Sequence, residues 1–171
     1  MNENELLIEL NACKEAQAWL AEQGAVSPGW AWHACKRGDW MLWLAGKLNV
    51  DRKLLVLAAC DCAELALVHV PVGEERPRRC IEVTRAWCRG EASVEQVREA
   101  RLAAYTASAS DAAAYAASCA AADAAATVYT VAAASNAAAS SAASAAACAA
   151  SCAASSADST KGLAECASLV G

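Results

Sequence analysis

The feature that most constrains this chain is a stretch of 47 residues, 111–157, that carries only two charges. It reads DAAAYAASCAAADAAATVYTVAAASNAAASSAASAAACAASCAASSA. A membrane span needs about 20 strongly apolar residues, whereas Ala is close to neutral and Ser and Asn oppose insertion. Disordered segments are rich in Pro, Gly and charge, and no Pro or Gly occurs between Glu91 and Lys161. Because Ala is the best helix former, the stretch is predicted to be helical.

An alanine helix has little to bury alone, so it is expected to pack closely against other helices. Breaks are predicted near residues 108–111, 135–136 and 155–160, which would divide the region into several helices. The alternative is one long helix over residues 93–157. A helix rises about 1.5 Å per residue, so this helix would be too long for a compact domain of this size. A seven-residue spacing predicts a packing seam at Tyr115, Ala122, Tyr129, Asn136, Ala143 and Ala150.

The first half of the chain also reads as helices, because apolar residues recur at helical spacing and no segment alternates like a strand. The predicted caps are Asn4 for a helix to Gln23, Ser27 with Pro28 at the first helical position, Asp39, Asp51, and Ser93 with Gln96 in a capping box. A further helix is expected over residues 78–89, ending at Gly90. The predicted fold class is all-α: a compact bundle in which Trp-containing N-terminal helices pack on Ala/Ser/Cys-rich helices.

Charge is distributed unevenly along the chain. Residues 1–101 hold 28 of the 33 charged residues, whereas alanine supplies 33 of the 70 positions in 102–171. No Pro or Gly separates the halves after Gly90, so the expectation is a single domain over residues 1–171, with a charged Trp-rich half (1–101) and an Ala-rich half (102–171).

The net charge of −5 argues against a nucleic-acid partner, which would require a basic face. The start of the chain, MNENELLIEL, has no basic segment followed by an apolar run, so we expect no secretion signal. Ten cysteines without such a signal indicate reduced thiols in a cytoplasm. The expected location is therefore cytoplasmic, without a membrane span.

No cluster of residues predicts catalysis, a metal or a cofactor. Cys60 and Cys62 point about 200° apart on a helix, so they are expected to pack as small apolar side chains. Cys148 and Cys152 are one turn apart but lack a second ligand pair at zinc-like spacing. The two histidines, His33 and His69, are interpreted as structural. Asp61 and Glu64, in an otherwise apolar helix, fit either a solvent face or a ligand cavity.

Exposed charges are the candidate partner-binding residues, since loops and rare surface charges carry recognition more often than cores do. Three are assigned to the loop that follows Val70 and begins PVGEERP, and two lie in the alanine-rich region: Arg76, Arg78, Arg79, Asp111 and Asp123. Trp40 and Trp43 are assigned to the core.

Four segments carry a family resemblance: EAQAWLAEQG, WHACKRGDWMLWLAGKL, RKLLVLAACDCAELALVHVPVGEERPRRCIEVTRAWCRGEAS and VREARLAAYTASASDAAAYAA. From about Glu15 to about Ala125 the chain resembles the Imm5-like family of bacterial immunity proteins. The resemblance implies an all-helical cytoplasmic protein that neutralises a polymorphic toxin by binding it, with related reading frames in phages and no catalytic residues. After about residue 126 the chain is richer in Ser and Cys than the family pattern.

Four hypotheses follow. The first is an immunity protein that occludes a toxin, and the second is a phage-encoded inhibitor of a bacterial defence complex, also acting by binding. The third is an enzyme or metal protein that uses the cysteines, and the fourth is a structural homo-oligomer. The absence of a catalytic constellation favours a binding protein whose partner is a toxin or a defence-complex subunit.

Overall fold

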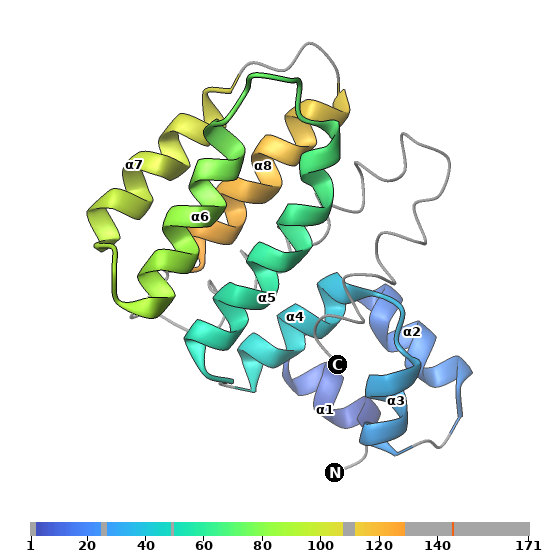
Figure 1. Ribbon diagram of the computed structural model, residues 1–171. Helices are drawn as coiled ribbons and strands as arrows, with labels where there is room; N and C mark the ends of the chain where they lie inside the picture. The colour runs from blue at the N-terminus through green and yellow to red at the C-terminus, as the bar shows by residue number, and fades with distance from the viewer. Residues whose placement is uncertain (1–2, 25–26, 49, 108–111, 129–144, 146–171) are drawn as a thin grey trace. The chain divides into compact units, whose positions relative to one another are not determined.

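The computed structural model describes residues 3–24, 27–48, 50–107, 112–128 and 145, and the remaining residues are not discussed structurally. Within these ranges the chain forms helices and turns, with no strand, so the all-α prediction is confirmed (Figure 1). Contacts between Cα atoms divide the chain into two units, Met1–Cys35 and Lys36–Val170. The single domain predicted over residues 1–171 stays a prediction.

Among its described residues the first unit contains three short helices: α1 (Glu3–Glu9), α2 (Lys14–Glu22) and α3 (Pro28–Ala34). The prediction of one helix from Asn4 to Gln23 is wrong, because the chain turns at Asn11, whose φ is +57°. Asn and Gly tolerate this left-handed conformation, and the Ala12 amide closes the turn on the Leu7 carbonyl at 2.9 Å. The Ser27 cap is confirmed, since its hydroxyl accepts the Trp30 amide at 3.2 Å.

The second unit contains five α-helices and one 3-10 turn within the described ranges: α4 (Gly38–Lys47), α5 (Arg52–Leu65), η1 (Ala66–His69), α6 (Arg76–Arg89), α7 (Val94–Tyr105) and α8 (Ala112–Ala126). Helices α5, α6 and α7 lie side by side with α6 in the middle, and α8 packs behind them against all three (Figure 1). Helix α4 contacts α5. This arrangement places an alanine-rich helix at the centre of the packing.

Small side chains explain the central position of α8. The described side chains from Ala120 to Val128 are buried, except for Asp123, which is half-buried. Larger residues of the other helices complete the core, and the largest fully buried side chains include Leu42, Val56, Ile81 and Val97. The thiol of Cys80 donates to the Ala121 carbonyl at 3.4 Å, a contact that requires the α6 side chain to reach the α8 backbone. Alanine faces allow this close approach.

Helix α7 crosses the change of composition at residue 102 without a break. It ends at Tyr105, and α8 begins at Ala112, so the alternative of one long helix over residues 93–157 is wrong. Of the predicted seam, Ala122 is fully buried, and the other five side chains lie outside those described. The breaks predicted at 135–136 and 155–160 also lie outside the described residues, as do Cys148 and Cys152.

Local caps set the other helix starts. Asp51 accepts the Lys53 amide at 2.8 Å, and Ser93 with Gln96 forms both bonds of a capping box, so these predictions are confirmed. The predicted helix at 78–89 begins two residues earlier, at Arg76, and ends as predicted at Gly90, whose φ is +82°. A left-handed residue closes the helix there, and glycine adopts it without a Cβ penalty.

The predicted Asp39 cap is wrong, because Asp39 lies inside the first turn of α4 and its carboxylate is bound by Arg37. The guanidinium makes a two-pronged contact, with Nε 2.9 Å from Oδ1 and Nη2 2.8 Å from Oδ2. Trp40 and Trp43 are half-buried rather than fully in the core. Arg37 lies 4.4 Å from the Trp40 ring centre and Lys47 lies 5.2 Å from that of Trp43, so cations cover the ring faces.

Candidate functional site

The prediction that Arg76, Arg78 and Arg79 lie on a loop is wrong, because all three lie in the first turn of α6. The segment between α5 and α6 leads directly into these three of the five predicted partner-binding residues. This segment contains a β-turn in which the Glu74 amide donates to the Pro71 carbonyl at 3.0 Å. Gly73, the third residue of this turn, has φ of +91°, the conformation that a type II turn requires there. Helix α6 then begins at Arg76, and Pro77 occupies its first turn, where a missing amide proton costs nothing.

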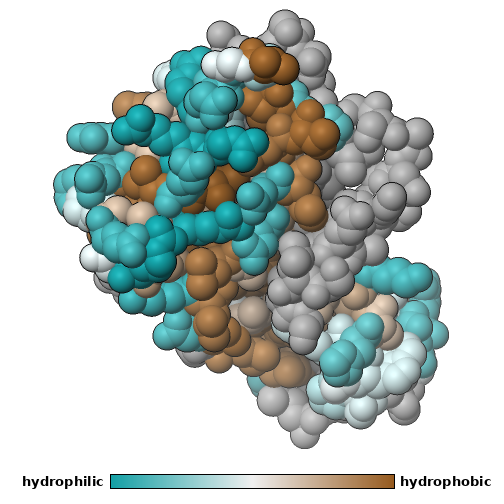
Figure 2. All heavy atoms as spheres, viewed as in Figure 1, coloured by the Kyte–Doolittle hydropathy of each residue, from teal (hydrophilic) through white to brown (hydrophobic). Residues whose placement is uncertain are grey.

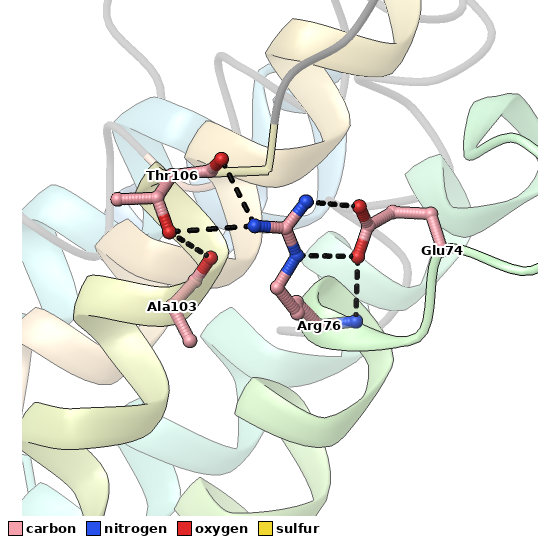
Figure 3. Close-up of polar contacts among 4 residues, drawn as sticks. All are labelled: Glu74, Arg76, Ala103 and Thr106. Carbon is pink, nitrogen blue, oxygen red and sulfur yellow. Dashed lines mark hydrogen bonds and ion pairs between the residues drawn. The ribbon is translucent and has the colours of Figure 1, made fainter.

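Arg76 is engaged by the protein itself (Figure 3). Its Nε lies 2.8 Å from Glu74 Oε1, and its Nη2 binds the other oxygen of the same carboxylate. Its Nη1 donates to the Thr106 carbonyl at 3.0 Å, and the Thr106 hydroxyl in turn donates to the Ala103 carbonyl at 2.9 Å. Arg76 therefore joins the loop before α6 to the end of α7, a role that sequence spacing did not indicate.

The same contacts determine the charge of Glu74. Hydrogen bonds from the Arg76 side chain and from its backbone amide lower the pKa of the Glu74 carboxyl to about 2. The carboxylate, in return, raises the pKa of the Arg76 guanidinium. Both groups remain ionised throughout the physiological range, and the pair is a fixed feature of the loop.

Arg78 and Arg79 lie on the exposed face of α6 and differ from Arg76 in their surroundings. The Arg78 Nε is 3.7 Å from a Glu75 carboxylate oxygen, a long contact between two exposed side chains. Arg79 lines a shallow depression of about 410 Å³ together with Glu75, Glu82 and Val83. Both arginines are exposed, so their guanidinium groups are accessible to a partner. An exposed pair such as Arg78–Glu75 contributes little to stability, so Arg78 can exchange it for another carboxylate at small cost.

Asp123 lies on α8 and accepts a hydrogen bond of 2.9 Å from the Tyr105 hydroxyl. Burial, and then this bond, raise the pKa of the Tyr105 phenol. The Arg101 guanidinium stacks 4.8 Å from the centre of the same ring. Asp123 thus attaches to the last turn of α7, where Arg76 also binds, whereas Asp111 lies outside the described residues.

Sequence reasoning missed Arg85, which explains the two carboxylates of α5. Its Nη2 binds Asp61 and lies 2.6 Å from Glu64 Oε2. Burial works to lower the pKa of Arg85, but hydrogen bonds to Glu64 and Asp61 raise it above its usual range. The solvent-face interpretation agrees with the exposure of the two side chains, 40% for Asp61 and 48% for Glu64, and the ion cluster with Arg85 joins them to α6. The sequence signal for this cluster is an Arg on α6 together with two carboxylates three residues apart on the preceding helix, α5.

The sequence analysis also missed an apolar surface beside the arginines. Leu65, Val68 and Val72 are exposed, and Val68 and Val72 are the two most exposed large hydrophobic residues in the described part of the chain. Figure 2 shows hydrophobic atoms over the loop between α5 and α6, at the top of the view, bordered by hydrophilic atoms of α6. Several neighbouring apolar residues exposed together are typical of an interaction site.

The described cysteines include four that are buried: Cys60, Cys62, Cys80 and Cys88. For these four, the packing role predicted from sequence is confirmed, whereas Cys13 is exposed and Cys35 and Cys119 are half-buried. Burial raises the pKa of the Cys60 and Cys80 thiols. Within the described ranges, no three His, Cys, Asp or Glu side chains gather as ligands for a metal ion. His33 is exposed, and His69 ends the η1 turn.

None of the helices in the described residues has the length and apolar character that a membrane crossing requires. The chain matches no family model, no curated protein and no solved structure.

Proposed function

We propose that this chain is a non-catalytic binding protein that neutralises a bacterial toxin by direct contact, as its resemblance to the Imm5-like immunity proteins implies. The observation that carries the proposal is the pair of exposed guanidinium groups, Arg78 and Arg79, at the start of α6. They extend from a helix whose entry is fixed by the bonds of Arg76 to Glu74 and Thr106. Arginine on a rigid support is a favoured recognition element, because less side-chain and loop motion is lost on binding.

Ten cysteines in the chain, together with the resemblance to Imm5-like proteins, support a protein that acts in the cytoplasm. The partner we propose is a protein with an acidic surface, either a toxin or a subunit of a bacterial defence complex. A phage-encoded inhibitor of such a complex would use the same contacts, so the identity of the bound protein separates the two functions.

The experiment is affinity capture from the cells in which the protein naturally occurs. Tagged full-length protein is the bait, and bound proteins are identified by mass spectrometry. One partner in stoichiometric amount is expected, with recovery reduced by the double variant Arg78→Glu/Arg79→Glu. The matched control is Arg89→Glu, at the other end of α6, which changes an equally exposed arginine and is expected to leave recovery unchanged.

A captured toxin must also lose its lethality when the two proteins are co-expressed. A toxin that remains lethal would contradict immunity, whereas a captured defence subunit would favour the phage inhibitor. Failure to recover any stoichiometric partner would contradict both functions.

A further inference from the structure

The loop between α5 and α6 exposes apolar side chains to an unusual degree. Val72 has a relative exposure of 107% and Val68 of 81%, which means that the protein covers almost none of either side chain. Leu65, at the end of α5, is 39% exposed. These three residues, which we call the apolar tip, lie within eight positions of one another in the chain.

The apolar tip is held in place by contacts along its length. Within it, the Val70 amide donates to the Leu67 carbonyl at 3.1 Å and closes the η1 turn that carries Val68. After it, the β-turn from Pro71 to Glu74 closes at 3.0 Å, and Arg76 binds Glu74 to the end of α7. Val72 therefore occupies the second position of an anchored turn, and little conformational freedom remains to be lost on binding.

Charge around the tip indicates the kind of partner. Residues 65–79 contain three arginines and two glutamates, so this segment is positive in a chain whose net charge is −5. Glu74 is bound to Arg76, and the exposed Glu75 lies 3.7 Å from Arg78 in a long contact, so the segment keeps one net positive charge. Arg78 and Arg79 both lie on the exposed face of α6. A complementary surface offers an apolar pocket for the valines and carboxylates for the two guanidinium groups.

We propose that the apolar tip inserts into an apolar pocket on the protein partner, with Arg78 and Arg79 paired to carboxylates at the rim of that pocket. This inference rests on the proposed function and specifies the surface that performs it. A central apolar anchor surrounded by charged contacts is the common arrangement of a protein–protein interface. A second copy of this chain in a two-fold contact fits less well, since it would present the same positive segment.

Site-specific photocrosslinking tests the surface directly. In the cells in which the full chain naturally acts, p-benzoylphenylalanine replaces Val72 in one variant and Leu54 in the other. Leu54 is the matched control, because it is an exposed apolar residue, 60% accessible, at the opposite end of α5 from Leu65. The expected result is one protein adduct from position 72 and none from position 54. The double variant Arg78→Glu/Arg79→Glu is expected to reduce that adduct.

The crosslinked protein is then purified and its affinity for the chain is measured. Val72→Asp is expected to weaken binding about tenfold or more, as loss of a buried interface anchor does. Leu54→Asp is expected to leave the affinity unchanged, and both variants change surface residues only.

The outcomes separate this inference from the proposed function. A protein adduct from position 54 alone would contradict the assignment of the apolar tip as the binding surface, whereas the proposal that the chain is a binding protein would stand. An adduct of the chain with itself, or with lipid, would also contradict the assignment of the tip, and so would equal adducts from both positions. No adduct from either position, together with no partner in the affinity capture, would overturn the function and the tip together.

Discussion

Arg76 donates from its Nη1 to the main-chain carbonyl of Thr106, 3.0 Å away, and so joins the start of α6 to the end of α7. The last carbonyls of a helix lack partners within that helix, and its C-terminus attracts a cation. Arg76 meets both requirements while the rest of its guanidinium holds Glu74. One side chain therefore fixes the loop that presents Val72 and the entry of the helix that presents Arg78 and Arg79.

Arg76→Ala is expected to lower the urea midpoint of unfolding, because its charge-assisted hydrogen bonds to Glu74 and Thr106 are lost. Urea unfolding at pH 7 measures the change. Arg78→Ala is the matched control, since its contact with Glu75 is 3.7 Å long and exposed. The control is expected to change stability by less than about 0.5 kcal/mol. Equal losses in the two variants would show that Arg76 has no joining role.

The Glu74–Arg76 pair predicts a dependence of stability on pH. The pKa of Glu74 is lowered from 4.5 to about 2 in the folded protein. A lowered carboxyl pKa contributes stability that is complete above the unfolded pKa and is lost as the pH falls through the folded one. Glu74→Gln is therefore expected to destabilise the protein at pH 6 and to have a shrinking effect between pH 4.5 and 2.

Urea unfolding midpoints of both proteins, measured at intervals from pH 6 to pH 2.5, test this prediction. Glu75→Gln controls for the general loss of a negative charge beside the same helix. A constant difference between the wild type and Glu74→Gln at every pH would contradict the assignment of this carboxylate.

The ion cluster between α5 and α6 predicts coupled effects. Arg85→Met leaves Asp61 and Glu64 close together without their cation, so we expect a loss of about 1–2 kcal/mol. In an Asp61→Asn/Glu64→Gln background the same substitution is expected to cost less, because no carboxylates remain to repel each other. A double-mutant cycle measures the difference. Additive effects would mean that the cluster contributes nothing to the packing of α5 on α6.

The confirmed predictions concern features that are local in sequence. The caps at Ser27, Asp51 and Ser93 follow from side chains that reach backbone amides two or three residues ahead. Asn11 was missed because apolar spacing continues across it, and only its left-handed backbone ends α1. Asp39 has the residue type of a cap, but Arg37 takes its carboxylate.

The candidate site was predicted only in part, for a different reason. The sequence indicated that Arg76, Arg78 and Arg79 lie together on a charged segment, and adjacent numbering was sufficient for that. It did not indicate that Arg76 is held by Thr106, thirty residues away, because this contact depends on how α6 and α7 cross. The exposure of Val72 was missed for a similar reason, since a valine beside Pro and Gly gives no sign of whether another helix covers it.

Burial predicts which described cysteines react in the folded protein. Cys80 lies between α6 and α8 with its thiol 3.4 Å from the Ala121 carbonyl, and burial raises its pKa to about 12. The thiol therefore stays protonated at pH 8, whereas the thiolate is the nucleophile. Brief treatment of the native protein with iodoacetamide is expected to modify the exposed Cys13 and to spare Cys80.

Peptide mass spectrometry locates the modified residues, and treatment in 6 M guanidinium provides the fully reactive reference. Cys60 is expected to be spared with Cys80, since it is also fully buried. The rate of modification at Cys80 is expected to depend on how often the contact between α6 and α8 opens. Ala121→Ser, which destabilises this contact, is therefore expected to raise the rate at Cys80. The rate at Cys13 is expected to stay unchanged. Equal native-state rates at Cys13 and Cys80 would contradict the close packing of α6 on α8, because a thiol held against the α8 backbone has no access to the reagent.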